Sequence, residues 1–314
     1  MEAILNTGIA EAMVIGDPSP AMAEEARKLA PDAVLAGSLE ELLAQDLDGI
    51  VIATPSAQHA EQSIRALEAG IAVFCQKPLG RTAEEVEAVV SAAEAADRLL
   101  GVDLSYRHTA GMNRIHEIIR AGELGKIFAA DLVFHNAYGP DKPWFYDRAL
   151  SGGGCLMDLG VHLIDMALWS LEFPTVASVA GHLVSGGFPA ALDDHQVEDY
   201  AVATLVLEGG AVIRLACSWR LQAGRDAVIE ARFFGTNGGV SMHNVDGSFY
   251  DFAVERFYGC SREILLEPPD DWGGRAAADW ARRLAGGQKY DPACEKLVGV
   301  AEIIDRIYGR AGRS

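Results

Sequence analysis

The sequence lacks the features that mark disulfide-stabilised, cysteine-metal and membrane proteins. Its five cysteines include no C-x-x-C pair, and their odd number fits free thiols in a reducing compartment better than a disulfide framework. No apolar run approaches the roughly 20 residues that cross a bilayer. No basic segment followed by an apolar one marks a secretory signal. These absences predict a cytoplasmic protein with no membrane partner.

Positive charge is also scarce. Lysine and arginine number 26 against 45 aspartates and glutamates, which gives a formal net charge of −19. Such an acidic surface repels phosphodiester backbones, so we expect no nucleic-acid partner. Half of the residues are apolar and 23% are charged, which is typical of globular proteins. At roughly 150 residues per domain, a chain of 314 residues indicates two domains.

In the first third of the chain, short apolar runs alternate with amphipathic helical patterns. Strands are expected at 12–15, 49–53, 71–75 and 99–104, and helices at 20–29, from 38 onward, 56–69 and 82–96. This alternation predicts a Rossmann-type, doubly wound parallel α/β sheet in residues 1–103. Ligands bind such sheets beyond the carboxyl ends of the strands. The segments that follow the expected strands are residues 17, 54–56, 76–78 and 106–108.

Residues 104–314 show a different pattern. Strands are expected at 127–136, 176–184, 197–207, 211–219, 228–234 and 249–257, and helices at 112–120, 156–171, 276–284 and 294–307. Glycine turns join several consecutive strands, which favours antiparallel pairing. We therefore predict an α+β domain with a large, mainly antiparallel open sheet. Helices on one face would leave the other face free for contact in a homodimer or homotetramer.

A lysine stands where the sheet is expected to bind its ligand. Gln76-Lys77-Pro78 follows directly after a buried strand. A lysine at this position can stabilise a developing alkoxide or pass a proton. The alternative is a solvated surface lysine, but the place after the strand and the rigid proline favour a functional role.

The segment from Gly152 to Asp165 is the most informative. Three consecutive glycines permit a close approach of the backbone to a ligand at a helix start. Asp158 and His162 are four residues apart and share one face of a helix. Histidine titrates near neutral pH and can take a proton from a hydroxyl. Two alternatives remain: a satisfied core histidine, or a metal site made by Asp158, His162 and Asp165.

The remaining candidates carry weaker signals. Asp17 ends an expected strand, where an acidic residue can bind the adenine ribose, although Asp-Pro-Ser-Pro is also a good turn. The segment from Thr54 to His59 follows a buried strand, and a helix cap is its alternative interpretation. No role is assigned to five further polar residues, which are His182, Asp193, Asp194, His195 and His243.

Together these pieces resemble the glucose–fructose oxidoreductase / inositol dehydrogenase (Gfo/Idh/MocA) family over nearly the whole chain. The family pattern has a strand ending in Glu-Lys-Pro, followed later by Gly-Gly-Gly-x-x-x-Asp-x-Gly-x-His-x-x-Asp. Residues 152–165 match the second pattern without a break, and Thr54, Pro55 and His59 match a third segment. Val197-Glu198-Asp199 and Ser218-Trp219 resemble strands of the family's second domain.

The resemblance implies an NAD-dependent oxidoreductase that acts on a secondary alcohol of a sugar, inositol or related polyol. Lys77, Asp158 and His162 would be catalytic. Arg107 and Trp144 would join Asp158 and His162 in binding the substrate. An acidic Asp17 favours NAD over NADP, because a carboxylate repels the extra phosphate. The residues expected to bind the cofactor are Asp17, Thr54, Pro55, His59, Gln76 and Lys77.

Two departures from the family pattern stand out. Gln76 replaces the usual glutamate and loses its charge. Residues 1–6 resemble the helix after the family's first strand and glycine loop, so we expect the natural protein to extend upstream by roughly two dozen residues. If it does not, NAD binding should be weak or absent. Two other functions therefore stay open: a non-catalytic sugar-binding or scaffold protein, and a metal-dependent hydrolase or lyase using Asp158, His162 and Asp165.

Overall fold

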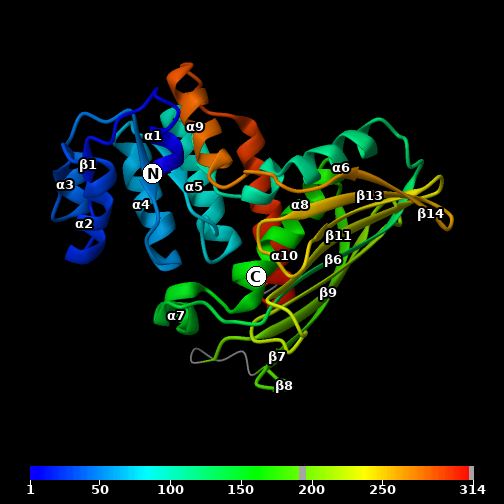
Figure 1. The fold of residues 1–314 in the computed structure, drawn as a ribbon. Coiled ribbons are helices and arrows are strands. Elements are labelled where there is room, and N and C mark those ends of the chain that lie inside the picture. Colours follow the sequence, from blue (N-terminus) through cyan, green and yellow to red (C-terminus); the bar gives the residue numbers. More distant parts are fainter. Residues whose placement is uncertain (191–195, 311–314) are drawn as a thin grey trace. The chain divides into compact units, whose positions relative to one another are not determined.

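The computed structural model describes residues 1–190 and 196–310 (Figure 1). The chain divides into two compact units. The first holds Met1–Gly80, Glu84–Ser105 and Gly273–Glu295; the second holds Arg81–Ala83, Tyr106–Trp272 and the chain from Lys296 onward. Within the described ranges, no helix is both long enough and apolar enough to cross a membrane.

The first unit contains the predicted parallel strands. β3 (Gly49–Ile52), β4 (Ala72–Cys75) and β5 (Leu100–Val102) form one sheet in that order, and every neighbouring pair is parallel. All four residues of β4 are buried, as expected for a strand covered on both faces. β1 (Val14–Ile15) and β2 (Val34–Leu35) form a separate parallel pair. The Rossmann-type prediction is confirmed.

Short helices connect these strands in the predicted order. The prediction for residues 56–69 is refined, because a 3-10 turn at Ser56–Gln58 precedes α4. Ser38 caps α3 by accepting a hydrogen bond from the Glu41 amide at 3.2 Å, as its capping-box pattern predicts. The helices of this region are α1 (Glu2–Leu5), α2 (Pro20–Leu29), α3 (Leu39–Leu43), α4 (His59–Glu68) and α5 (Ala83–Ala96).

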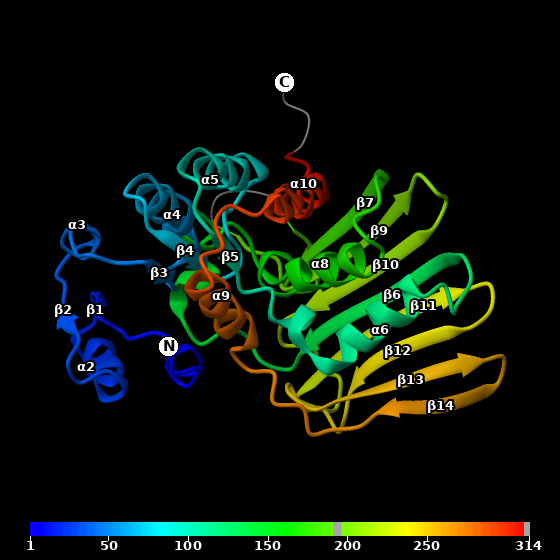
Figure 2. The same cartoon turned by 90° about the horizontal axis from the view of Figure 1, so that it is seen from above.

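A late segment returns to the first unit. Helix α9 (Arg275–Ala285) packs on β4 and β5 (Figure 2). The Trp280 ring lies 5.7 Å from that of Phe74. A Cβ atom on Gly49 or Gly101 would stand 2.6 or 2.7 Å from the Trp280 ring, so both strands need glycine there. The predicted division into 1–103 and 104–314 places Gly273–Glu295 in the second domain, whereas in the structure this segment belongs to the first unit.

The second unit is built on one large sheet. In the described part of this unit, nine strands lie in the order β14-β13-β12-β11-β6-β10-β9-β7-β8, and only the β6–β10 pair among them is parallel. The predicted large, mainly antiparallel sheet is confirmed. Its strands are β6 (Ile127–Asn136), β7 (Val176–Ser185), β8 (Phe188–Pro189), β9 (Tyr200–Leu207), β10 (Val212–Ser218), β11 (Ala227–Gly235), β12 (Gly239–Asn244), β13 (Phe252–Tyr258) and β14 (Ser261–Leu266).

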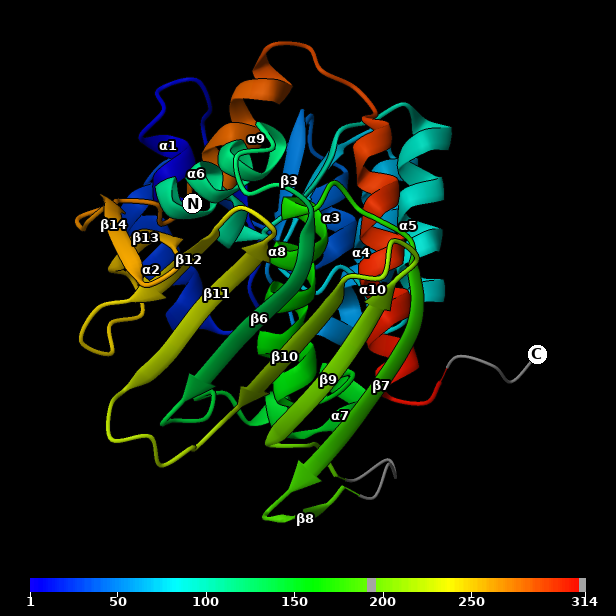
Figure 3. The same cartoon turned by 90° about the vertical axis from the view of Figure 1, so that its right-hand side faces the viewer.

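Helices cover one face of this sheet. α6 (Ala110–Arg120), α8 (Val161–Ser170) and α10 (Lys296–Ile307) pack on the strands (Figure 3). Alternate strand residues face the helices, as Ala201, Ala203 and Leu205 of β9 do, and these are fully buried. α8 is buried along nearly its whole length. This burial fixes the helix that carries His162.

Candidate functional site

Two helical elements in direct succession carry Asp158 and His162. Asp158 lies in a π-helical turn, Leu156–Gly160, and His162 is the second residue of α8. The sequence predicts one regular helix here, and the structure differs in the wide first turn. Such π-turns close i→i+5 bonds and occur frequently at functional sites. The two side chains therefore come from adjacent turns of a buried, continuous helical segment.

Asp158 is held by an indole. The Nε1–H of Trp219 donates to Oδ2 of Asp158 at 3.0 Å. Trp219 follows directly after β10 and is only 3% exposed. A neutral donor orients the carboxylate without cancelling its charge. The sequence analysis placed Trp219 only in a strand resemblance; its distance of 61 residues from Asp158 gave no signal of the contact.

The His162 ring packs against the ring of Tyr106. Its ring centroid is 5.1 Å from that of Tyr106, in an edge arrangement, and His162 is 6% exposed. Burial and the negative charge of Asp158 raise the pKa of the Tyr106 hydroxyl above its usual value. Tyr106 therefore stays a neutral phenol beside the imidazole. The sequence analysis noted Tyr106 only as a residue beyond a strand.

Arg107 and Asp165 bind each other. The Arg107 Nε donates to Oδ2 of Asp165 at 2.7 Å, and Nη2 donates to Oδ1. The guanidinium also lies 5.3 Å from the centre of the Phe173 ring. Burial raises the pKa of Asp165, and the Arg107 charge opposes that rise. Two of the Arg107 donors are therefore used by Asp165. The substrate role of Arg107 stays a prediction.

The ion pair also bears on the metal hypothesis. Asp165 is the third residue of the Asp158, His162 and Asp165 set, and its two oxygens accept from Arg107. Over residues 1–190 and 196–310, no group of three His, Cys, Asp or Glu residues is arranged to hold a metal ion. Asp193, Asp194 and His195, which were assigned no role, lie outside the described residues.

Trp144 belongs to an aromatic cluster near Asp158. It lies in the turn Pro143–Tyr146 and stacks on Phe145, with ring centroids 3.8 Å apart. Phe145 and Tyr146 both contact Trp219 edge-on, at 6.5 and 5.6 Å. Trp144 is half-buried. The structure therefore joins the predicted substrate residue Trp144 to Asp158 through Trp219.

In the first unit, Gln76 joins two strand ends. It follows β4, and its Nε2 donates to Oδ2 of Asp103, which follows β5, at 2.9 Å. A glutamate could not donate this bond and would face a second carboxylate. Asp103 thus gives a physical reason for the neutral residue beside Lys77.

His59 connects two loops beyond the strands. Its Nδ1 lies 2.6 Å from the Pro78 carbonyl oxygen and its Nε2 lies 2.7 Å from that of Thr54. His59 is 1% exposed, and burial lowers the pKa of its imidazole below the usual 6.5. Both ring nitrogens lie against backbone carbonyls, and a neutral imidazole donates to one of them. His59 therefore fixes the loop that carries Lys77 rather than presenting a free edge to a cofactor.

The remaining predicted cofactor residues lie at the carboxyl ends of parallel strands. Thr54 and Pro55 follow β3, and Thr54 donates through Oγ1 to Gln62 at 2.8 Å. Asp17 follows β1, is exposed, and accepts the Ser19 amide at 2.7 Å. β1 belongs to the separate strand pair, so Asp17 is not on the same sheet as Lys77. These residues lie at strand ends, where open parallel sheets bind their ligands, and their role in cofactor binding stays a prediction.

Two family models match the chain. Residues 1–104 match a model described as "Oxidoreductase family, NAD-binding Rossmann fold", and residues 112–241 match the "GFO/IDH/MocA C-terminal domain". Inositol 2-dehydrogenase of Rhodococcus erythropolis is 33% identical over 291 residues, which cover 90% of this chain and 74% of that protein. D-Glucoside 3-dehydrogenase of Escherichia coli is 29% identical over 214 residues, 64% of this chain and 60% of that protein.

Solved structures share the fold. Levoglucosan dehydrogenase in complex with NADH and levoglucosan superposes with a TM-score of 0.82 at 22% identity, covering 99% of this chain and 93% of that one. The 3-ketoreductase KijD10 from Actinomadura kijaniata gives 0.84 at 21%, covering 98% and 91%. For several curated relatives the matched segment spans only half to three fifths of their length. Both family models and the inositol 2-dehydrogenase match agree, and the chain belongs to the Gfo/Idh/MocA oxidoreductase family.

Proposed function

We propose that this chain is an NAD-dependent oxidoreductase acting on a secondary alcohol of a sugar, inositol or related polyol. One observation carries the proposal: Asp158, oriented by Trp219, directly precedes the turn that bears the buried His162. A fixed carboxylate and an imidazole on adjacent turns suit the handling of a hydroxyl and its proton. Membership in the oxidoreductase family supports the same reaction class.

Each catalytic residue has a distinct role in this proposal. A ring nitrogen of His162 takes the hydroxyl proton during oxidation and returns it during reduction. Asp158 accepts a hydrogen bond from the reacting or adjacent hydroxyl. The ammonium of Lys77 stabilises negative charge on the substrate oxygen. When bound, the nicotinamide would supply the site that accepts or gives the hydride.

Residues at the strand ends of the first unit would hold the cofactor. We propose that four residues line the cofactor: Thr54, Pro55, Gln76 and Lys77. His59 would hold the loops that carry them, through its contacts with the carbonyls of Thr54 and Pro78. The exposed carboxylate of Asp17 would bind the adenine-ribose hydroxyls and disfavour the phosphate of NADP. We therefore propose NAD as the preferred cofactor.

The aromatic cluster supports a hydroxyl-rich ring as substrate. Aromatic faces cover the apolar faces of such rings, while carboxylates and imidazoles bind their hydroxyls. Trp144 is the proposed platform because it stands in the cluster that includes Trp219. Arg107, which pairs with Asp165, is the further residue proposed to bind the substrate.

The sheet face away from α6, α8 and α10 is proposed to bind a second copy of this chain. Val133, Ala216 and Val202 stand side by side across β6, β10 and β9, so apolar groups continue over three strands. We propose a homodimer or homotetramer through this face. Sedimentation velocity on the wild type and Val202→Lys tests it, and a monomeric wild type would contradict it.

Absorbance of NADH during incubation with a panel of sugars and inositols tests the function. Turnover with at least one of them is expected, and His162→Ala and Lys77→Ala should each lower kcat by about two orders of magnitude or more. Binding of a sugar by calorimetry without any turnover would favour a non-catalytic sugar-binding protein. Near-normal rates in either variant would remove that residue's role.

A further inference from the structure

The three glycines before Asp158 make room for the protein's own groups. A Cβ on Gly153 would stand 2.0 Å from the hydroxyl of Tyr308, and one on Gly154 would stand 1.9 Å from the Glu198 carbonyl oxygen. Gly152 has φ of +84° and would place a Cβ 2.8 Å from Arg81. The sequence analysis assigned this close approach to a ligand. The structure corrects that interpretation, because protein atoms fill each of these positions.

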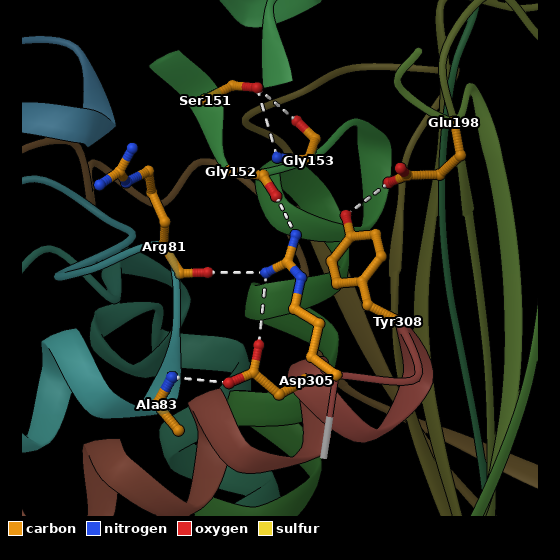
Figure 4. Close-up of polar contacts among 9 residues, drawn as sticks. Arg81, Ala83, Ser151, Gly152, Gly153, Glu198, Asp305 and Tyr308 are labelled. Atoms are coloured by element: carbon orange, nitrogen blue, oxygen red, sulfur yellow. Dashed lines mark hydrogen bonds and ion pairs between the residues drawn. The ribbon is translucent and has the colours of Figure 1, made fainter. Parts of the chain in front are cut away.

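Glu198 binds the amides at the start of the Asp158 turn. Its carboxylate accepts from the Gly154 amide at 3.0 Å and from the Leu156 amide at 2.9 Å. The Tyr308 hydroxyl donates to the same carboxylate at 2.8 Å (Figure 4). Glu198 is 3% exposed. Amides at a helix start have no partner within the helix, and a negative charge there is favourable.

α10 and the residues after it supply a second set of contacts. The Arg310 guanidinium donates to the carbonyl oxygen of Gly152 and, at 2.9 Å, to that of Arg81. It also reaches Oδ1 of Asp305 at 3.3 Å, while Oδ2 of Asp305 accepts the Ala83 amide at 2.8 Å. Figure 4 shows these contacts around one guanidinium. One arginine thus joins the backbone at 81 to the backbone at 152.

The backbone held at 152–156 leads to proposed catalytic residues. Gly154 comes four residues before Asp158. Leu156, which Glu198 holds, opens the π-turn that carries Asp158. Burying a charged network is costly, so a network of this kind is poor evidence for a gain in stability alone. Control of geometry is a better explanation.

We propose that Glu198, Asp305, Tyr308 and Arg310 form a clasp, made largely by α10 and the residues just after it, that positions the segment bearing the Asp158–His162 pair. This inference rests on the proposed function. These four are positioning residues, since they act through the backbone at 81–83 and 152–156. A displacement of about 1 Å at reacting groups can cost about a hundredfold in rate. The clasp therefore acts on turnover more than on cofactor affinity.

Two variants and a matched control test the clasp. Tyr308→Phe keeps the ring against Gly153 and removes only the hydroxyl. Arg310→Ala removes the link between residues 81 and 152. Arg306→Ala is the control, because Arg306 lies on α10 two residues before Tyr308 and donates to two carbonyls, at Val176 and Ala177, away from the glycines. All three variants remove side-chain hydrogen bonds made by α10 or by the three residues after it.

The expected result is a split between kcat and cofactor binding. Tyr308→Phe and Arg310→Ala should lower kcat about tenfold or more, with the NADH dissociation constant within twofold of the wild type. Arg306→Ala should keep kcat within twofold, and Arg310→Lys should recover part of the loss. Wild-type kcat in Tyr308→Phe and Arg310→Ala, or an equal loss in Arg306→Ala, would overturn the clasp.

Hydrogen exchange separates failure of the clasp from failure of the proposed function. Amides over residues 153–160 should exchange faster in Tyr308→Phe and Arg310→Ala than in the wild type or Arg306→Ala, whether or not the enzyme turns over a sugar. If the wild type turns over no sugar or polyol, the proposed function fails. If exchange in this segment is unchanged, the clasp fails, whatever the turnover.

Discussion

The indole of Trp219 and the carboxylate of Asp158 form a direct hydrogen bond, with Nε1 3.0 Å from Oδ2. The tryptophan lies at the end of β10 and the aspartate lies in the π-turn before α8. A residue that follows a strand of the large sheet thereby orients the Asp158 side chain on the helical segment. The donor is neutral, so it orients Asp158 without forming an ion pair with it.

Trp219→Phe removes this donor and keeps most of the ring. A hydrogen bond to a charged group contributes about 1.5–3 kcal/mol, so the carboxylate should sample other orientations. We expect kcat to fall by about tenfold to a hundredfold, with NADH affinity unchanged. Steady-state kinetics and an NADH fluorescence titration measure both.

Trp169→Phe is the matched control for that change. Trp169 lies on α8 and stacks on His116, with ring centroids 4.2 Å apart. This variant should turn over like the wild type. Equal losses in the two tryptophan variants would show that ring volume, and not the bond to Asp158, accounts for the effect.

Gln76→Glu should make stability depend on pH. The new carboxylate would stand where Nε2 now donates to Asp103 at 2.9 Å. Two carboxylates so close raise the pKa of one of them, so the folded state favours the protonated form. The variant is then most stable at low pH and loses stability as pH rises, by about 1.4 kcal/mol for each unit of pKa rise. Urea unfolding at pH 5 and pH 8 measures the change.

Gln76→Met gives the comparison for the pair with Asp103. It loses the same hydrogen bond but adds no charge, so its destabilisation should be similar at both pH values. A Gln76→Glu variant that behaves identically to Gln76→Met would rule out repulsion by Asp103.

His59 should make the wild type less stable in mild acid. Burial lowers the pKa of His59 below 6.5, so the unfolded chain takes up the proton first as pH falls. Relative to His59→Gln, which does not titrate, the wild-type free energy of unfolding should be greatest above pH 6.5. Below that value it should fall by at most about 1.4 kcal/mol per pH unit. An advantage that grows toward pH 5 would instead mean that the Thr54 and Pro78 carbonyls hold an imidazolium.

Local pattern predicted the elements of the fold better than their partners. The apolar run of β4 identified a buried strand because all of its residues pack on both sides. No local pattern predicted that α9 packs on the first unit. This packing depends on the Trp280 ring, which fills the space beside Gly49 and Gly101. Contacts between distant segments depend on the register of the whole sheet, which no short window contains.

The same limit applies to the candidate site. Sequence reasoning selected Asp158, His162 and Lys77 from their spacing and their place after strands. It identified three glycines, Gly152-Gly153-Gly154, whose backbone another group approaches closely. It could not identify Tyr308 and Glu198 among the groups that approach it. The sequence likewise did not predict that Arg107 pairs with Asp165.

Arg107→Ala distinguishes a structural role from a substrate role for this arginine. Its removal leaves the carboxylate of Asp165, which is 1% exposed, without a countercharge. Breaking such a buried pair costs about 3–5 kcal/mol, so the midpoint of urea unfolding should fall clearly. Burial already raises the pKa of Asp165, and losing Arg107 raises it further. The variant should therefore be most stable in acid and weaken as pH rises, and Asp165→Asn added to it should remove that dependence. A normal unfolding curve together with a raised KM for the sugar would show instead that Arg107 binds substrate.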